Sequence, residues 1–408
     1  MKKILYLSYD GLLDPLGQSQ ILPYLEGLAA LNYSISIISF EKKSKLSLVN
    51  PLQRRLNALN IFWIPLHYHK KPVIVSTIFD LVRMYVHAKE VVKGRKVDLI
   101  HVRSYLPALL AKRIKHRFKI PYVFDIRGFW IDERIEGKIW NPKNPIFKVV
   151  IRYLRKEEKL LFSQARYTIV LTAKAKELLA NGFPAYSNPA HTVVIPCCVD
   201  SQLFSPSKVS REILDKWRGK FNLLQRDKII IYHGSWGTWY LTNRVLEFMA
   251  CAANFDPDYF FLIVTPTNHE SILKEAKEHK VPVNRLGVVA ATRSEIPELL
   301  RLATLAIFFI NPGFSKQASS PTRLAEIVSM ALPLVTNQGI GDNDVLLTNQ
   351  PCGFLVKSFN ALEYAQILER ISSLNHHFYS QSLLDYFSLE KGINAYDKVY
   401  QSLANTDT

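Results

Sequence analysis

The sequence GFSKQASSPTRLAEIVSMALPLVTNQGIGDND, at residues 313–344, contains the strongest structural signals in the chain. It follows the apolar run 305–310, which has the length and the β-branched and aromatic content of a buried strand. A loop rich in Ser, Gly and Pro comes next, and Ser-Ser-Pro at 319–321 signals the start of a helix. We expect that helix to begin near Thr322 and to run to about residue 331.

The start of this helix has the features of a nucleotide site. Free backbone N–H groups and the positive end of the helix dipole favour an anion there. A cation in the first turn is unfavourable for the dipole, so Arg323 indicates an external anionic partner. Glu326 follows one turn later, and its carboxylate can accept hydrogen bonds from the vicinal diol of a ribose. A buried α/β helix with one surface Arg–Glu pair is the alternative.

Three short motifs in this region resemble a known donor site. Ser-Pro-Thr-Arg-x-x-Glu at 320–326, Ala-Leu-Pro-Leu-Val at 331–335 and Gly-Ile-Gly-Asp at 339–342 are similar to the donor segment of retaining GT-B glycosyltransferases of family four. The resemblance implies that Glu326 holds the ribose of a nucleotide sugar. The family has a further Glu on the transferred sugar, and this chain has Ala318 there.

The length of 408 residues fits two domains, and strand and helix signals alternate along both halves. The resemblance implies a GT-B fold, an α/β fold of two Rossmann-like domains whose parallel sheets face a central cleft. The segment Ile-Pro-Cys-Cys-Val-Asp at 195–200 is similar to the family's linker Ile-Pro-Asn-Gly-Val-Asp. We therefore expect an acceptor domain over 1–200, with a C-terminal helix within 385–408 packing back on it, and a donor domain over 201–384.

The predicted elements can be given by residue. Strands are expected at 3–8, 34–40, 61–64, 97–102, 122–125, 167–171, 228–233, 259–264, 283–289 and 305–310. Helices are expected from the loop after residue 17 to about 31, before 60, and at 76–93, 359–373 and 389–403.

Polar and aromatic residues follow the predicted strands of the first domain, at the edge where open α/β sheets bind ligands. Aromatic faces stack on sugar rings, while arginine and carboxylates bind hydroxyls. We assign four such residues to the acceptor: His101, Arg103, Trp130 and Glu133. Family members commonly have a His on the donor sugar, and Asp125 and Arg127 are offered here as catalytic substitutes. A structural histidine and an internally paired Asp–Arg loop are the alternatives.

The donor assignments rest on the resemblance and on loop chemistry. No GxGxxG occurs, which argues against a dinucleotide-binding dehydrogenase. The family's diphosphate-binding Arg and Lys are replaced by Ser235 and Tyr240, so Arg323, the helix N-terminus beside it and Arg244 are expected to stabilise the leaving group. For Gly17 a turn glycine is an equal alternative. The donor residues are Gly17, Gln18, Gly234, Ser235, Ser320, Thr322, Arg323, Glu326 and Gly339.

The net charge of +17 lies in the first half of the chain, where residues 1–200 hold 32 Lys and Arg against 15 Asp and Glu. Basic clusters at 112–119 and 148–159 favour contact with an anionic surface. The second cluster also has apolar residues at helical spacing, so it predicts a helix that lies on an anionic leaflet or one that packs on the sheet. No apolar run approaches the roughly 18 residues of a spanning helix. We expect a cytoplasmic protein, peripheral on the inner face of the membrane.

Metal and cofactor sites are not expected. Asp342-Asn343-Asp344 has the spacing of a DxD motif, but helix capping is favoured. His67 and His69 lack a third ligand nearby. The four cysteines have no CxxC spacing and should be reduced. No nucleic-acid-binding motif accompanies the basic charge.

The sequence therefore predicts a retaining, metal-independent glycosyltransferase. It would move a sugar from a nucleotide-diphosphate sugar to a lipid-linked or saccharide acceptor, as in cell-surface polysaccharide biosynthesis. The family implies attack from the leaving-group face, with a donor phosphate oxygen taking the acceptor proton. Two alternatives are a nucleotide-sugar epimerase of the same fold and a catalytically inactive module that binds a membrane or a polyanion.

Overall fold

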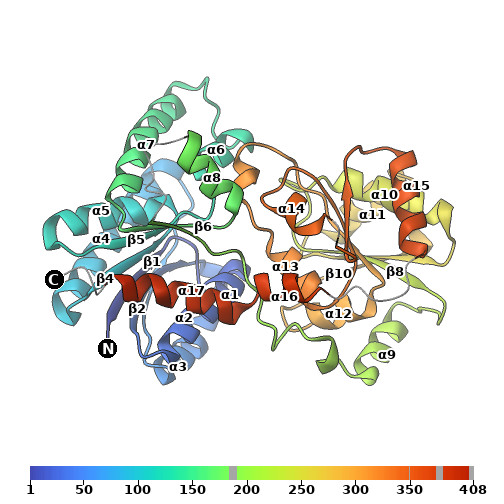
Figure 1. The fold of residues 1–408 in the computed structure, drawn as a ribbon, viewed down its shortest axis with the longest axis horizontal. Helices are drawn as coiled ribbons and strands as arrows, with labels where there is room; N and C mark the ends of the chain where they lie inside the picture. The colour runs from blue at the N-terminus through green and yellow to red at the C-terminus, as the bar shows by residue number, and fades with distance from the viewer. Residues whose placement is uncertain (183–190, 349, 374–379, 404–408) are drawn as a thin grey trace. The chain divides into compact units, whose positions relative to one another are not determined.

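The computed structural model describes residues 1–182, 191–348, 350–373 and 380–403, and it divides into two compact units (Figure 1). Unit 1 comprises Met1–Cys198 and Leu389–Thr408, and unit 2 comprises Val199–Ser388. The sequence placed these boundaries at 200 and 384. The chain thus leaves unit 1 once and returns to it with its last helix.

Unit 1 is built on a seven-stranded parallel sheet in the order β3-β2-β1-β4-β5-β6-β7. Its strands are β1 (Lys3–Ser8), β2 (Ser34–Glu41), β3 (Phe62–His67), β4 (Leu99–Arg103), β5 (Tyr122–Asp125), β6 (Tyr167–Val170) and β7 (Thr192–Val194). Its helices are α1 (Pro15–Gln20), α2 (Leu22–Ala30), α3 (Val49–Ala58), α4 (Val73–Arg95), α5 (Tyr105–Phe118), α6 (Trp130–Glu136), α7 (Pro145–Gln164), α8 (Ala173–Gly182) and α17 (Leu389–Ser402). Figure 1 shows α2, α3 and α17 on one face of this sheet and α4, α5 and α7 on the other.

The C-terminal helix α17 packs on α2. A Cβ built on Gly27 would lie 2.2 Å from Cδ1 of Ile393, so the side chain of Ile393 occupies the space beside this glycine. Aromatic rings interlock beside it, since Tyr24 meets Tyr396 and Tyr33 meets Tyr400 edge to face. These contacts make α17 part of the core of unit 1.

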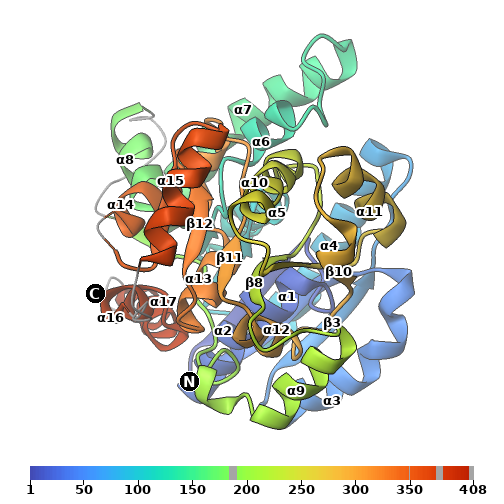
Figure 2. The ribbon, with the colours of Figure 1, turned by 90° about the vertical axis from the view of Figure 1, so that its right-hand side faces the viewer.

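Unit 2 has a six-stranded parallel sheet in the order β10-β9-β8-β11-β12-β13. Its strands are β8 (Lys228–His233), β9 (Tyr259–Val264), β10 (Leu286–Val289), β11 (Leu305–Ile307), β12 (Leu334–Asn337) and β13 (Gly353–Val356). Its helices are α9 (Arg211–Lys220), α10 (Thr242–Phe255), α11 (His269–Glu278), α12 (Ile296–Leu302), α13 (Thr322–Ser329), α14 (Asn343–Leu347), α15 (Ala361–Ser372) and α16 (Gln381–Tyr386). Figure 2 shows α10, α11 and α15 on one face of the sheet, with α12 and α13 on the other.

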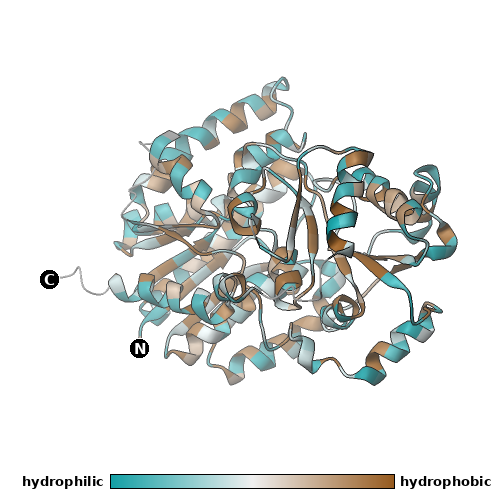
Figure 3. Ribbon diagram, turned by 45° about the vertical axis from the view of Figure 1, so that its right-hand side comes forward, coloured by the Kyte–Doolittle hydropathy of each residue, from teal (hydrophilic) through white to brown (hydrophobic). Residues whose placement is uncertain are grey.

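The strands of both units are mostly apolar and buried, because helices cover both faces of each sheet (Figure 3). All six residues of β9, Tyr-Phe-Phe-Leu-Ile-Val, are buried. A parallel sheet is only stable in this sandwiched form, so the ligand-binding positions are left at the carboxyl ends of the strands.

Some predicted elements differ from the structure in detail. The helix expected to run to residue 31 is two helices, α1 and α2, which break at Ile21 because Pro23 has no N–H to continue the hydrogen-bond ladder. Strand β11 ends at Ile307, earlier than expected, and Asn337 hydrogen-bonds the backbone N–H and C=O of Ile310. The predicted strand at 283–289 begins with a 3-10 turn and is extended only from Leu286.

Candidate functional site

The guanidinium of Arg323 lies in an aromatic enclosure at the start of α13, the helix that begins at Thr322 as predicted. Its Cζ is 4.0 Å from the ring centre of Tyr240 and 5.0 Å from that of Tyr232. The side chain is 7% exposed and Nη1 has no hydrogen-bond partner among the described residues. A buried cation with an unused donor costs free energy until an anion binds it. Arg323 is therefore the strongest anion-binding group of the candidate site.

Gly234 follows β8 directly and makes room for this guanidinium. Its φ is +112°, and a Cβ there would lie 2.2 Å from Nη2 of Arg323. Gly237, three residues later, also has a positive φ of +80°, but a Cβ there would meet nothing within 4 Å. Both glycines therefore have a positive φ, and they differ in their contact with Arg323.

A Gly234→Ala variant is expected to bind a nucleoside diphosphate more weakly than wild type, because the new methyl group displaces Arg323. The positive φ and the clash together should lower the free energy of unfolding by about 2–4 kcal/mol. Gly237→Ala is the matched control: it should lose only about 1–2 kcal/mol from backbone strain and keep the affinity. Calorimetric titration and thermal unfolding of both variants measure this, and equal affinity in the two would refute the role of Gly234.

Glu326 lies one turn after Arg323 and is held by two basic side chains that the sequence had not indicated. Its Oε2 accepts a hydrogen bond from Nε2 of His233 at 3.2 Å, and its Oε1 accepts one from Nη1 of Arg293 at 2.9 Å. Glu326 is 6% exposed. A carboxylate has about four lone-pair sites, so each oxygen can accept one further hydrogen bond. The geometry suits a diol that bridges both oxygens.

The electrostatics keep this carboxylate ionised. Burial raises the pKa of Glu326, but the hydrogen bond from His233 and the charge of Arg293 outweigh burial, and the pKa is lowered overall. Burial lowers the pKa of His233, so its imidazole is neutral and donates Nε2–H to the carboxylate. The site therefore offers an acceptor-only group beside the cation of Arg323.

The loop before α13 contains another buried cation, Lys316. Nζ of Lys316 lies 3.6 Å from the ring centre of Trp239, and the residue is 5% exposed. Ala318, where the family has a Glu, is fully buried. The burial of Lys316 was not predicted, because no residue pattern in this loop indicates that a lysine is buried.

The other predicted donor residues have varied surroundings. Ser235 is exposed, while Ser320 and Thr322 are half-buried at the start of α13. Gly339 has a φ of +84°, and its N–H donates to both carboxylate oxygens of Asp344, at 3.1 and 3.2 Å. Arg244 pairs with Glu247 on the same helix. Arg323, Glu326 and Gly234 thus form the compact part of the predicted donor set.

Gly17 and Gln18 of the predicted donor set lie in unit 1. Gly17 is buried, and a Cβ there would lie 2.2 Å from the carbonyl oxygen of Gly11. The side chain of Gln18 donates to the carbonyl oxygen of Leu12 at 2.8 Å. Both residues hold the loop that follows β1, so their contact with a ligand stays a prediction.

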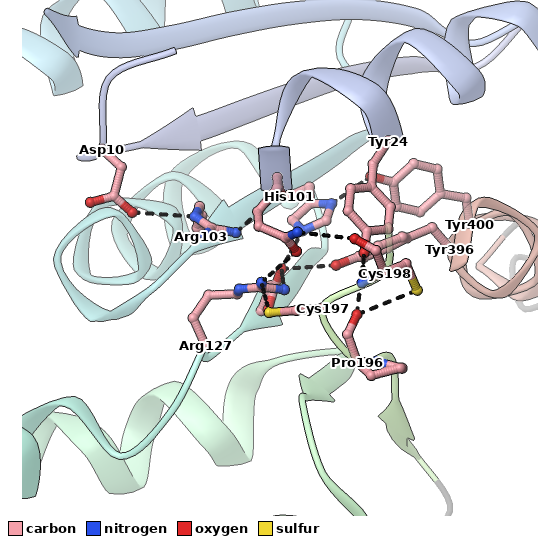
Figure 4. A network of polar contacts seen from close by, with 12 residues as sticks. Asp10, Tyr24, His101, Arg103, Arg127, Pro196, Cys197, Cys198, Tyr396 and Tyr400 are labelled. Atoms are coloured by element: carbon pink, nitrogen blue, oxygen red, sulfur yellow. Dashed lines mark hydrogen bonds and ion pairs between the residues drawn. The ribbon is translucent and has the colours of Figure 1, made fainter. Parts of the chain in front are cut away.

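The predicted catalytic pair, Asp125 and Arg127, belongs to a buried polar network in unit 1 (Figure 4). Asp125 is 1% exposed, and its Oδ2 lies 3.6 Å from Nη1 of Arg127 and 3.7 Å from Nε2 of His101. Tyr396 donates to the same oxygen at 3.0 Å, and His101 Nδ1 contacts the hydroxyl of Tyr400. The network connects β4 and β5 to the C-terminal helix α17, which gives Asp125 and His101 a structural role.

Arg127 occupies a strained position in this network. Its φ is +56°, in the left-handed region that few residues other than glycine adopt. Its Nη2 contacts Sγ of Cys197 at 3.1 Å and Oε1 of Gln20 at 3.4 Å. A strained arginine at the carboxyl end of β5 is held there by these contacts, and a catalytic role stays a prediction.

The remaining acceptor residues line the same edge of the sheet. Nε of Arg103 pairs with Oδ2 of Asp10 at 3.2 Å. The ring of Trp130 stacks on Tyr105 at 5.9 Å, while Glu133 lies in the first turn of α6. These side chains are internally packed, and their contact with an acceptor stays a prediction.

The structure shows the surroundings of the Asp342–Asp344 motif and of the cysteines. Asp342 is the N-cap residue of α14 but makes no capping hydrogen bond, so the predicted capping role is wrong in detail; its Oδ2 accepts from the hydroxyl of Tyr386 instead. Among the described residues no group of three or more His, Cys, Asp and Glu could hold a metal ion. The four cysteines form no disulfide in the part of the chain that the structure describes. In the part of the chain that the structure covers, no helix is long and apolar enough to cross a membrane.

Comparisons with known proteins support the fold. Residues 21–203 match the family model described as Glycosyltransferase Family 4. A glycosyltransferase from Rickettsia africae superimposes with a TM-score of 0.72 at 17% identity, covering 100% of this chain and 99% of that one. Alr3699/HepE from Anabaena, solved in complex with UDP and glucose, has a TM-score of 0.70 at 14% identity, covering 99% and 100%. WaaG, a glycosyltransferase involved in lipopolysaccharide biosynthesis, has a TM-score of 0.62 at 12% identity, covering 99% and 100%. No curated protein matches the sequence.

Proposed function

We propose that the chain is a retaining GT-B glycosyltransferase that uses a nucleoside diphosphate sugar; the fold of both units and the match of residues 21–203 to the Glycosyltransferase Family 4 model support this proposal. The predicted fold class of two α/β domains with parallel sheets is confirmed. The observation that carries the proposal is the pairing of a buried, unsatisfied Arg323 with the acceptor-only carboxylate of Glu326 one turn away.

In this proposal unit 2 holds the donor. The free lone pairs of Glu326 accept the two ribose hydroxyls, and His233 and Arg293 keep the carboxylate charged and oriented. Nη1 of Arg323 and the N–H groups at the start of α13 bind the diphosphate. Because negative charge builds on the diphosphate as the sugar leaves, these donors stabilise the transition state more than the ground state.

The transfer step is proposed to retain the anomeric configuration. The acceptor hydroxyl attacks the anomeric carbon from the side of the leaving group while the bond from that carbon to the phosphate oxygen breaks. The acceptor proton passes to a phosphate oxygen of the leaving diphosphate. Arg323 and the helix terminus meet the developing charge in this scheme, which assigns no metal.

The acceptor is proposed to be a saccharide or a lipid-linked molecule at the inner face of the membrane. The basic excess of the first 200 residues supports an anionic acceptor or surface. WaaG, which shares the fold, is involved in lipopolysaccharide biosynthesis. Both observations favour a place in the assembly of a cell-surface polysaccharide.

The test is a thermal-shift titration of the purified protein with a panel of nucleotides and nucleotide sugars, followed by product analysis with and without an acceptor extract. A ligand that binds the native state raises the melting temperature by mass action. We expect one diphosphate nucleotide to do so and its sugar to appear on an acceptor. A rearranged nucleotide sugar without acceptor would indicate an epimerase. Binding without turnover would indicate an inactive module, and no shift with any nucleotide would overturn the proposal.

A further inference from the structure

Helix α4 of unit 1 presents a stripe of apolar side chains to solvent. Val75, Ile78, Phe79, Val82 and Val86 are 44–64% exposed. Their spacing of three and four residues places them along one side of the helix. Isolated exposed apolar residues are ordinary, but five along one helix form a continuous patch that marks a binding surface.

The opposite side of α4 is fixed to the sheet, so the helix cannot rotate to hide this stripe. Met84, Ala88 and Val91 are buried beneath it. Asp80, fully buried, accepts hydrogen bonds from the backbone N–H of His69 at 3.0 Å and from the hydroxyl of Tyr9 at 3.2 Å. The apolar stripe is therefore a permanent feature of the surface.

Cations bracket the stripe at both ends. Lys70 and Lys71 are exposed immediately before α4, and Lys93 and Arg95 are exposed at its last turn. Glu90 is the only exposed acidic residue within the helix sequence, and it pairs with His87. An apolar centre with basic ends is complementary to the acyl chains and anionic headgroups of a leaflet.

The neighbouring helices extend this complementarity. Helix α5 packs between α4 and α7, and all three cover the same face of the sheet (Figure 1). The outer side of α5 exposes Arg113, His116 and Arg117. On α7, Ile146, Val149 and Tyr153 are 46–65% exposed, in a helix that also exposes the cations Lys148, Arg152 and Lys156.

We propose that the face formed by α4, α5 and α7 docks on an anionic lipid bilayer, with the α4 stripe inserted at the headgroup boundary. Apolar insertion and the attraction of basic residues to anionic lipid act together, as in interfacial helices. Phe79 also packs on His69 at 5.2 Å, beside the carboxyl end of β3 where open sheets bind ligands. Delivery of a lipid-linked acceptor to that edge rests on the proposed function, whereas bilayer binding does not.

The test is co-sedimentation of the full chain with vesicles of phosphatidylglycerol and phosphatidylcholine, and with vesicles of phosphatidylcholine alone. A triple variant carries Ile78→Ser, Phe79→Ser and Val82→Ser; its partition coefficient onto the anionic vesicles is expected to fall by at least about tenfold. The wild-type protein should bind the neutral vesicles more weakly than it binds the anionic vesicles. Wild-type binding that is independent of charge, or a triple variant that binds as wild type, would overturn the proposal.

A matched control comes from unit 2, where Val345 and Leu362 are 83% and 71% exposed. Val345→Ser combined with Leu362→Ser should leave vesicle binding unchanged. Both sets of substitutions are at the surface, so melting temperatures should stay close to wild type. If the triple variant altered self-association in sedimentation instead of vesicle binding, the surface would be a protein interface and the proposal would fail. The rise in melting temperature that a nucleotide causes in the triple variant tests the proposed function separately from membrane binding.

Discussion

An Asp125→Ala variant is expected to lose about 3–5 kcal/mol of the free energy of unfolding. The substitution removes the carboxylate that pairs with Arg127 and His101 in the buried network. It also leaves the hydroxyl of Tyr396 without its acceptor. A buried polar group that loses its partner lowers the free energy of unfolding by more than the hydrogen bond itself contributed, because the group stays out of contact with water. This is why the expected effect is large.

Denaturant unfolding measures the loss, with Asp14→Ala as the control. Asp14 also pairs with a cation in unit 1, but its partner Lys42 is 53% exposed, so that variant should lose less than about 1 kcal/mol. A loss for Asp125→Ala as small as for Asp14→Ala would show that the network contributes little to stability.

The pH dependence gives an independent check of the same prediction. Burial raises the pKa of Asp125, but Arg127 and His101 outweigh burial and the pKa is lowered overall. The stabilisation from a depressed carboxylate is complete above its unfolded pKa of about 3.9 and is lost as the pH falls through the folded pKa. The part of the difference between wild type and Asp125→Ala that comes from the ionisation of Asp125 itself should therefore stay constant from pH 7 to 5 and shrink only below about pH 4.

His101 produces a different pH dependence in the wild type. Burial lowers its pKa, so below about pH 6.5 the unfolded chain takes up a proton that the folded network excludes. The free energy of unfolding should therefore fall as the pH drops from 7 to 5, by at most about 1.4 kcal/mol per pH unit for this residue. His233, whose pKa is lowered for the same reason, adds to the slope.

The sequence predicted what depends on local signals. The helix beginning at Thr322, with Arg323 and Glu326 on adjacent turns, follows from residues within one short segment. The partners of those residues could not be predicted in this way. Tyr396 meets Asp125 across 271 residues, and His233 meets Glu326 across 93, and a hydrogen bond at such separation leaves no pattern in either segment.

Which side of each helix is buried also could not be predicted from the local sequence. A helix with apolar residues on several sides is expected to be buried, and α4 instead buries one side and exposes another. For α7 the sequence left two orientations open. The structure buries Leu154, Leu161 and Phe162 in unit 1 and leaves Ile146 and Val149 exposed, so one side of the helix packs on the unit, and contact of the exposed residues with a leaflet stays a prediction. Which apolar stripe meets the core depends on the tertiary neighbours.

Replacing Glu326 with Gln is expected to weaken the binding of the nucleoside diphosphate sugar by about 10–100-fold. The amide keeps the volume of the side chain but loses the charge, and hydrogen bonds to a charged acceptor contribute about 1.5–3 kcal/mol. One amide position also becomes a donor facing Nη1 of Arg293 or Nε2 of His233, both of which donate to Glu326 in the wild type. The mismatch disturbs the orientation that the ribose requires.

Calorimetric titration with the nucleotide found in the thermal-shift panel measures the affinity, and initial rates give kcat/KM. Glu298→Gln is the matched control, because Glu298 also accepts a partly buried hydrogen bond, from Nε1 of Trp217 at 2.7 Å, and belongs to α12 instead of α13. It should keep the affinity of wild type. If both variants bound the nucleotide equally well and only stability changed, Glu326 would be a structural carboxylate. The ribose contact would then have to be sought elsewhere among the polar groups around Arg323.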